Sequence, residues 1–204
     1  MISVVIRTIN RETLHASILS AGREFDEVIV VADASPLNRV ALVKVIASLP
    51  DKCKVKILDT GQRFDKYGSA ALNMGACAVS NDYFCLLDDD DEFVRGAGEY
   101  MRQFVMENKD HDIFIPGLRF NNGMELCKSP GLEYGNVAVP TFKTEWALKV
   151  PITPLHLNKF KVPSDAIDLS HVLACVDEGA KVSWYGKVLY LVRPHLPGTN
   201  GRGR

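Results

Sequence analysis

The chain has 204 residues, 47% of them hydrophobic and 24% charged, which is the composition of an ordinary soluble protein long enough to bury a real core. Its formal net charge of −1 provides no overall field that would attract nucleic acid or an anionic membrane. Because no apolar stretch approaches the roughly 20 residues of a membrane-spanning helix and the N-terminus lacks signal-peptide features, we expect a cytoplasmic protein without integral membrane association.

The first half of the chain alternates apolar runs with helical patterns. The runs predict strands at residues 2–6, 28–31, 55–58 and 83–87, and the first and the last of these are expected to be buried. Helical spacing of apolar residues predicts a helix after each strand, with inward faces built from Leu14, Ile18 and Ala21, from Val40, Val43 and Ala47, from Leu72, Gly75, Ala76 and Val79, and from Tyr100, Met101, Phe104 and Val105. Pro36 is expected in the first turn of the second of these helices. Four strand–helix units in succession predict a doubly wound, mostly parallel α/β sheet.

The second half, after about Asp110, has a different rhythm. Short apolar runs near Ile113, Leu118 and Met124 predict short antiparallel strands or hairpins. Further elements are expected as a helix at 141–150, a helix at 164–178, strands at 182–184 and 188–192, and a flexible basic tail at 197–204. No repeat or linker divides the chain, so we expect one domain over residues 1–204.

Four consecutive aspartates, Asp88 to Asp91, follow the fourth predicted strand without a spacer. Adjacent carboxylates repel one another unless a cation lies between them, and hard oxygen ligands suit Mg²⁺ or Mn²⁺. Ligands of open α/β sheets bind beyond the carboxyl ends of the strands. The alternative is a solvated acidic turn, which is the usual role of such runs.

The cysteines show neither a zinc-binding spacing nor a disulfide framework. Their number is odd and their neighbours are mostly apolar, so we expect buried free thiols in a reducing compartment; they are Cys53, Cys77, Cys85, Cys127 and Cys175.

Six segments, in chain order, resemble motifs of family 2 glycosyltransferases with the GT-A fold. Residues 2–11 (Ile-Ser-Val-Val-Ile-Arg-Thr-Ile-Asn-Arg) resemble the opening of that family, and residues 87–91 (Leu-Asp-Asp-Asp-Asp) resemble its Asp-x-Asp element. The remaining likenesses are to the family's second strand, a glycine-bounded helix, a late acidic helix start and an Arg-x-His element, at residues 27–35, 68–75, 163–169 and 192–195.

The resemblance implies an inverting transfer of a sugar from a nucleotide-diphosphate donor, with a UDP-sugar favoured, to an acceptor hydroxyl. Position by position, it implies contacts to the nucleotide sugar from Thr8, Asn10, Arg11, Asp33, Asn73, Asp88 and Asp89. It implies that Asp90 and His195 hold Mn²⁺ or Mg²⁺ and that Asp165 is the general base, with Asp168 as the runner-up. Residues 1–110 would bind the nucleotide and residues 111–196 would form the acceptor side.

The sequence also departs from the family pattern. Ala32 replaces the first acid of the pair that usually reads uracil, Leu72 replaces an arginine that contacts the diphosphate, and Arg7 replaces a proline. A nucleotidyltransferase and a non-catalytic nucleotide-binding module therefore remain alternatives. Structural roles are also open: Asp165 suits a helix start, Asp33 a turn, and Thr8, Asn10 and Asn73 could cap helices or turns.

Overall fold

The computed structural model describes residues 1–64, 68–127, 130–133, 137–163 and 166–193. The strands are β1 (Ile2–Thr8), β2 (Glu27–Ala32), β3 (Lys54–Asp59), β4 (Tyr83–Asp88), β5 (Glu92–Phe93), β6 (Ile113–Phe120), β7 (Glu125–Leu126), β8 (Thr141–Lys143) and β9 (Val182–Val192). The helices are α1 (Leu14–Glu24), α2 (Arg39–Ala47), α3 (Ser69–Cys77), α4 (Ala97–Glu107), α5 (Thr144–Lys149), α6 (Leu155–Phe160) and α7 (Ile167–Asp177).

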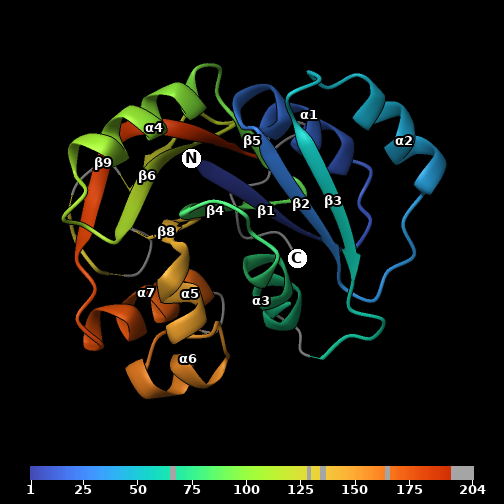
Figure 1. The fold of residues 1–204 in the computed structure, drawn as a ribbon. Helices are drawn as coiled ribbons and strands as arrows, with labels where there is room; N and C mark the ends of the chain where they lie inside the picture. Colours follow the sequence, from blue (N-terminus) through green and yellow to red (C-terminus); the bar gives the residue numbers. More distant parts are fainter. Residues whose placement is uncertain (65–67, 128–129, 134–136, 164–165, 194–204) are drawn as a thin grey trace.

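All the described strands belong to one curled sheet with the order β3-β2-β1-β4-β8-β6-β9-β5, and β7 pairs with β6 (Figure 1). The four neighbouring strands β3, β2, β1 and β4 are parallel to one another. Strand β8 pairs with β4 in the antiparallel direction. The register aligns Thr8 with Ala32 and Arg7 with Asp88. The carboxyl ends of β1, β2 and β4 therefore meet at one edge, as the sequence analysis predicted for a doubly wound sheet.

Helices cover both faces of the sheet (Figure 1): α1 and α4 lie on one face, and α3, α5, α6 and α7 lie on the other. The core between these layers is made of the fully buried apolar residues of β1, β2 and β4, such as Val5, Ile29 and Phe84. Their near-continuous burial explains why these strands read as apolar runs and not as alternating patterns.

Helix α3 approaches the sheet closely because it presents small residues to it. A Cβ atom added at Gly75 would lie 2.3 Å from Val5 Cγ1 and 3.1 Å from Val31 Cγ2. A side chain at position 75 would therefore have to displace Val5 and Val31 where α3 crosses β1 and β2, and Gly75 lies on the face of the helix that was predicted to point inward.

Replacing Gly75 with valine is expected to lower the free energy of unfolding by about 2–3 kcal/mol, since the added methyl groups must displace Val5 and Val31. Urea denaturation would measure the loss. The matched control is Met74→Val, which puts the same side chain at a neighbouring position that is 37% exposed and should change stability by less than about 0.5 kcal/mol. Equal midpoints for the two variants would contradict the close packing.

The prediction for α2 was wrong in two respects. Asn38 caps the helix through the Ala41 N–H, so Pro36 precedes the first turn and does not lie within it. Val40 and Val43 are 70% and 65% exposed, and only Leu42 of this helix is buried. The helix contacts α1 and is apolar on several faces, so periodicity alone did not select the buried one.

Other differences lie in the second half. Residues 141–150, expected as one helix, begin with β8 because Thr141 and Phe142 pair with both β4 and β6. The two expected closing strands are the single strand β9, which pairs parallel with β6 through a register irregularity. Helix α6 was not predicted, and Cys77 is exposed where a buried thiol was expected.

Candidate functional site

The turn after β4 gathers carboxylates at the carboxyl edge of the sheet. Oxygens of Asp88, Asp90 and Asp91 all lie within 4.8 Å of one another. The Asp88 side chain is 50% exposed, whereas Asp90 and Asp91 are both buried. Three hard oxygen donors at this spacing, one of them open to solvent, suit the coordination of Mg²⁺ or Mn²⁺.

Sheet pairing brings an arginine from the far end of the chain to this turn. β5 and β9 pair antiparallel with Glu92 opposite Leu191, so the chain that follows β9 runs alongside the acidic turn. The Arg193 backbone N–H donates to Asp91 Oδ1 at 3.0 Å, and Arg193 Nε lies 3.1 Å from Asp90 Oδ2. Asp90 therefore already has a cationic partner in this structure.

Arg7 meets the turn from the end of β1. Its guanidinium lies 3.4 Å from Asp88, and its side chain passes over Gly68, the N-cap of α3. Gly68 has φ of +70°, and a Cβ there would lie 2.1 Å from Arg7 Cδ. Glycine at this position therefore allows the arginine to reach the acidic turn.

Asp89 is the anchor of the loop that follows β1. Its carboxylate accepts hydrogen bonds from Thr8 Oγ1 at 2.6 Å and from the Ile9 N–H at 3.2 Å, and it is paired with Arg11. Thr13 Oγ1 donates to its backbone carbonyl. Asp89, Thr8 and Arg11 were all predicted to contact a nucleotide sugar; the structure brings them together, with these groups bonded to one another.

Burial and mutual repulsion change the proton affinity of the acidic turn. Burial raises the pKa of Asp90, Asp88 adds to this, and Arg11 and Arg193 oppose it. For Asp91, burial and the charge of Asp88 raise the pKa well above its usual value. A cation placed between these groups would relieve the repulsion that raises both values.

Asp168, in the first turn of α7, lies close enough to the acidic turn to interact with Asp88 and Arg7. Its Oδ2 accepts a hydrogen bond from the Val139 N–H at 2.8 Å. Burial, followed by the charge of Asp88, raises its pKa to about 6, against the lowering effects of the Val139 hydrogen bond and the Arg7 charge. A carboxylate whose pKa lies this close to neutrality has the proton affinity expected of a general base.

Among the described residues, the charges around the turn do not balance. With all groups ionised, Asp88 to Asp91 and Asp168 carry five negative charges, and the described arginines that reach them are Arg7, Arg11 and Arg193. The excess of two negative charges matches a single divalent cation, and the donor set is the kind that such an ion prefers.

Two other predicted residues lie at the same edge of the sheet, but their side chains form hydrogen bonds with backbone groups. Asn10, with φ of +65°, donates from its side chain to the Pro36 carbonyl at 2.8 Å. The Asn73 amide donates to the Ile152 carbonyl at 2.8 Å and accepts from the Ile152 N–H at 2.9 Å. This double hydrogen bond fixes α3 to the segment that precedes α6.

Asp33 follows β2 directly and is the predicted residue with the fewest partners. It is buried, neither carboxylate oxygen accepts a hydrogen bond, and Arg63 Nε lies 3.7 Å from Oδ2. Asp165 and His195, the predicted base and second metal ligand, lie outside the described residues.

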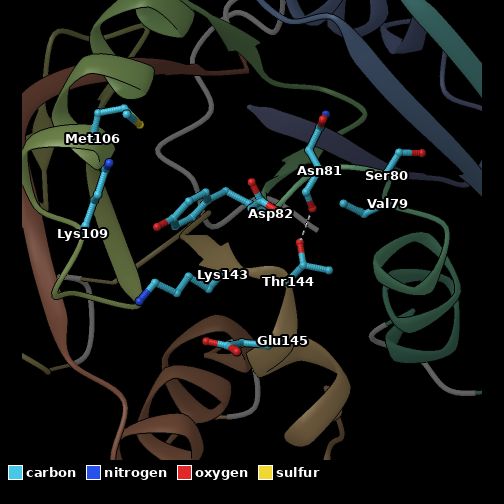
Figure 2. Close-up of a pocket in the computed structure, with 10 residues that line it drawn as sticks. Val79, Ser80, Asn81, Asp82, Met106, Lys109, Lys143, Thr144 and Glu145 are labelled. Carbon is cyan, nitrogen blue, oxygen red and sulfur yellow. Dashed lines mark hydrogen bonds between the residues drawn. The ribbon is translucent and has the colours of Figure 1, made fainter.

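A hollow of about 580 Å³ lies at the other end of β4 (Figure 2). Tyr83 is one of the residues that line it, and Figure 2 shows Lys109 and Lys143 among the others. Lys143 is paired with Asp112 at 2.7 Å. This hollow adjoins the amino end of β4, so it is separate from the acidic turn.

The family profile described as "Glycosyl transferase family 2" matches residues 3–164, which is more than half of the chain. The chain belongs to this family of glycosyltransferases. No curated protein matches its sequence.

Solved structures of other glycosyltransferases share the fold of this family member. The crystal structure of S. aureus TarS 1–349 is 16% identical, with a TM-score of 0.69, over 94% of this chain and 60% of that one. The same TarS fragment has been solved with UDP-GlcNAc, at 15% identity and a TM-score of 0.66 over 94% of this chain and 58% of that one. Mannosyltransferase PcManGT from Pyrobaculum calidifontis, in complex with GDP-Man and Mn²⁺, is 14% identical with a TM-score of 0.62, over 97% and 58%.

These likenesses show that the chain has the GT-A fold, as the sequence resemblance implied. The chain spans only about 60% of the length of these three structures. Among the described residues, none of the helices combines the length and hydrophobicity required to traverse a bilayer.

Three residues of the site were not predicted in the roles that they occupy. Arg7 had been noted only as a departure from a family proline, Arg193 only as part of the segment 192–195 that resembles an Arg-x-His element, and Asp91 only as part of the acidic run. The signal that could have found them is charge balance, since a run of four aspartates requires nearby cations even before a metal binds.

Proposed function

We propose that the protein is a metal-dependent, inverting glycosyltransferase that moves a sugar from a nucleotide-diphosphate donor to an acceptor hydroxyl. The observation that carries this proposal is the excess of negative charge where Asp88, Asp90 and Asp91 converge at the carboxyl edge of the sheet, opposite Asp168. Family membership supports sugar transfer, and the charge excess supports a divalent cation that would bridge the protein to a diphosphate.

Asp90, with Asp88 and Asp91, would hold Mn²⁺ or Mg²⁺, and His195 remains a predicted further ligand. The bound cation would act as a Lewis acid that stabilises the charge developing on the leaving diphosphate. Arg193 and Arg11 would give up their contact with Asp90 Oδ2 and become available to the donor phosphates.

The donor nucleotide would lie across the carboxyl ends of β1 and β2, beside the loop that Asp89 anchors and above Asp33. Thr8, Asn10 and Arg11 belong to that loop and would form its protein side. Related structures contain UDP, UDP-GlcNAc or GDP-Man, so a nucleotide sugar is the supported class of donor.

Asp168 would remove the proton from the acceptor hydroxyl as that oxygen attacks the anomeric carbon from the face opposite the leaving group. Its position near Asp88 and Arg7 and its raised pKa support this role, and Asp165, which lies outside the described residues, remains the other candidate. Attack from the opposite face inverts the configuration of the anomeric carbon.

A thermal-shift panel with UDP, GDP, UDP-GlcNAc and GDP-Man, each with and without Mn²⁺, tests the donor class. A ligand at about 100 times its Kd stabilises the folded state by about 2.7 kcal/mol, which raises the melting temperature by several degrees for a chain of this size. We expect such a shift for at least one nucleotide and a larger one with Mn²⁺. A melting temperature that none of these compounds changes would contradict the proposal.

A further inference from the structure

Strand β3 directs one row of backbone hydrogen-bonding groups away from the sheet. It is the last strand in the sheet order, and among the described strands β2 alone pairs with it (Figure 1). The Lys54 N–H donates to the Asp26 carbonyl at 2.8 Å, and the Thr60 N–H donates to the Ala32 carbonyl at 3.0 Å. Because the backbone groups of a strand alternate in direction, the even-numbered residues bond to β2, and the N–H and C=O groups of residues 55, 57 and 59 point outward.

The residues of β3 carry none of the usual features that prevent an edge strand from pairing. Proteins protect such edges with prolines, bulges or projecting charges. The β2–β3 register is continuous from Lys54 to Asp59, and this stretch contains no proline. The charge of Lys56 does not project outward, since its Nζ lies 2.9 Å from Glu27 and donates to the Ala78 carbonyl at 2.7 Å. The edge of β3 is therefore open to a further strand.

Apolar side chains are exposed beside this edge. Lys56 points to the α3 side of the sheet, so Ile57 points to the other side, where α2 contacts α1. Ile57 is 45% exposed, and Val40 and Val43 of α2 are 70% and 65% exposed. A hollow of about 250 Å³ is lined both by Ile57 and by Arg39, the first residue of α2. An open strand edge and an apolar helix face thus lie next to each other, as in surfaces that bind another protein.

We propose that β3 pairs antiparallel with β3 of a second copy of this chain, so that one sheet continues through a twofold dimer. A twofold axis perpendicular to the sheet passes through Ile57 and sets it opposite its own copy, with Val55 opposite Asp59 on either side. All three pairs are of the hydrogen-bonded type, which gives six new backbone hydrogen bonds. An axis through Lys56 would instead set two lysines opposite each other, an unfavourable arrangement.

The same axis explains why the second copy is the expected partner. Rotation about an axis perpendicular to the sheet leaves both α2 helices on one face of the joined sheet, so Val40 and Val43 of the two copies can cover one another. An unrelated strand would use the same backbone groups but would leave the valines of α2 exposed. No donor, metal or acceptor takes part, so this inference is independent of the proposed function.

Sedimentation velocity without nucleotide, between about 1 and 100 µM protein, tests the dimer. We expect the mass to approach twice the 22.6 kDa of one chain as the concentration rises. Ile57→Lys sets two charges opposite each other on the axis and should raise the dissociation constant at least about 10-fold for each of the two copies. The matched control is Met106→Lys, at a residue of α4 that is 61% exposed, and it should dimerise as the wild type does.

Amide hydrogen exchange provides a readout that locates the interface. Exchange of residues 54–59 should slow as the protein concentration rises, because the outward amides become hydrogen-bonded. Val43→Lys, on α2, should weaken the dimer in the same direction and provides the test if circular dichroism shows that Ile57→Lys does not fold. A monomer at every concentration would overturn the proposal, as would a dimer that both folded lysine variants leave unchanged or exchange of residues 54–59 that does not depend on concentration.

Discussion

Asp90→Asn is expected to abolish metal-dependent binding and to reduce transfer, or donor hydrolysis, by about 10²–10³-fold. Asp90 is a buried carboxylate of the acidic turn, and its loss would remove one of the three carboxylates that converge there among the described residues. The lost Lewis-acid stabilisation of the diphosphate is worth several kcal/mol, and each 1.36 kcal/mol is a factor of ten in rate. Titration with Mn²⁺, followed by the electron spin resonance of the free ion, measures binding independently of activity.

A second variant should change Mn²⁺ affinity in the opposite direction. Arg193 occupies Asp90 Oδ2 at 3.1 Å, so Arg193→Gln should remove a competing cation and tighten Mn²⁺ binding. Arg119→Gln, which breaks the more exposed ion pair with Glu125, is the matched control and should have no effect. Circular dichroism would confirm that each variant is folded. Wild-type Mn²⁺ affinity in a folded Asp90→Asn protein would contradict the metal site.

Asp168→Asn is expected to lower the transfer rate by about 10²–10⁴-fold, the usual contribution of a positioned general base. Asparagine cannot accept the proton of the acceptor hydroxyl, but it can still accept the hydrogen bond from the Val139 N–H. Donor affinity should therefore stay near the wild-type value. Rate constants under donor saturation, together with the donor Kd, separate these effects, and the same measurements on Asp165→Asn compare the two candidates directly. If only the Asp165 variant loses activity, the assignment of Asp168 is wrong.

The pH dependence follows from the raised pKa of Asp168, about 6 in the folded protein against an ordinary value of 3.8. A general base must be ionised, so the rate should fall as the pH drops through about 6, or at a lower pH when a bound cation offsets the charge of Asp88. Stability should change in the opposite sense. An acid whose pKa is raised by folding binds more protons in the folded state, so its contribution favours folding as the pH falls from above 6 towards 4. Asp168→Asn should remove this component from both profiles.

The sequence predicted those parts of the fold whose signal lies within one short stretch of the chain. The four parallel strands read as apolar runs, and the acidic turn follows one of them without a gap, so both were visible locally. β8 was missed because three residues carry no periodic signal; its strand character comes from pairing with β4 and β6. Likewise, the Arg193 contacts with the acidic turn join residues about one hundred positions apart, and they depend on the pairing of β5 with β9.

The sequence predicted which types of residue form the candidate site, but not which of these residues form hydrogen bonds or ion pairs with one another. Carboxylates after β4 indicated a cation, yet nothing local showed that Asp89 would anchor the loop after β1 while its neighbours remained grouped. Nor did the sequence show that Asn73 would bond to Ile152, since an asparagine side chain can serve a ligand or a neighbouring backbone equally well.

The Asn73–Ile152 pair has a mechanical consequence. One sheet contains strands from both halves of the chain, and this double hydrogen bond joins α3 to the segment before α6 away from that sheet. Because the shared sheet and the Asn73–Ile152 hydrogen bonds connect the described parts of the two halves at separate places, we expect no hinge opening between them. Admission of donor and release of product would then depend on local rearrangement of side chains and loops at the rim.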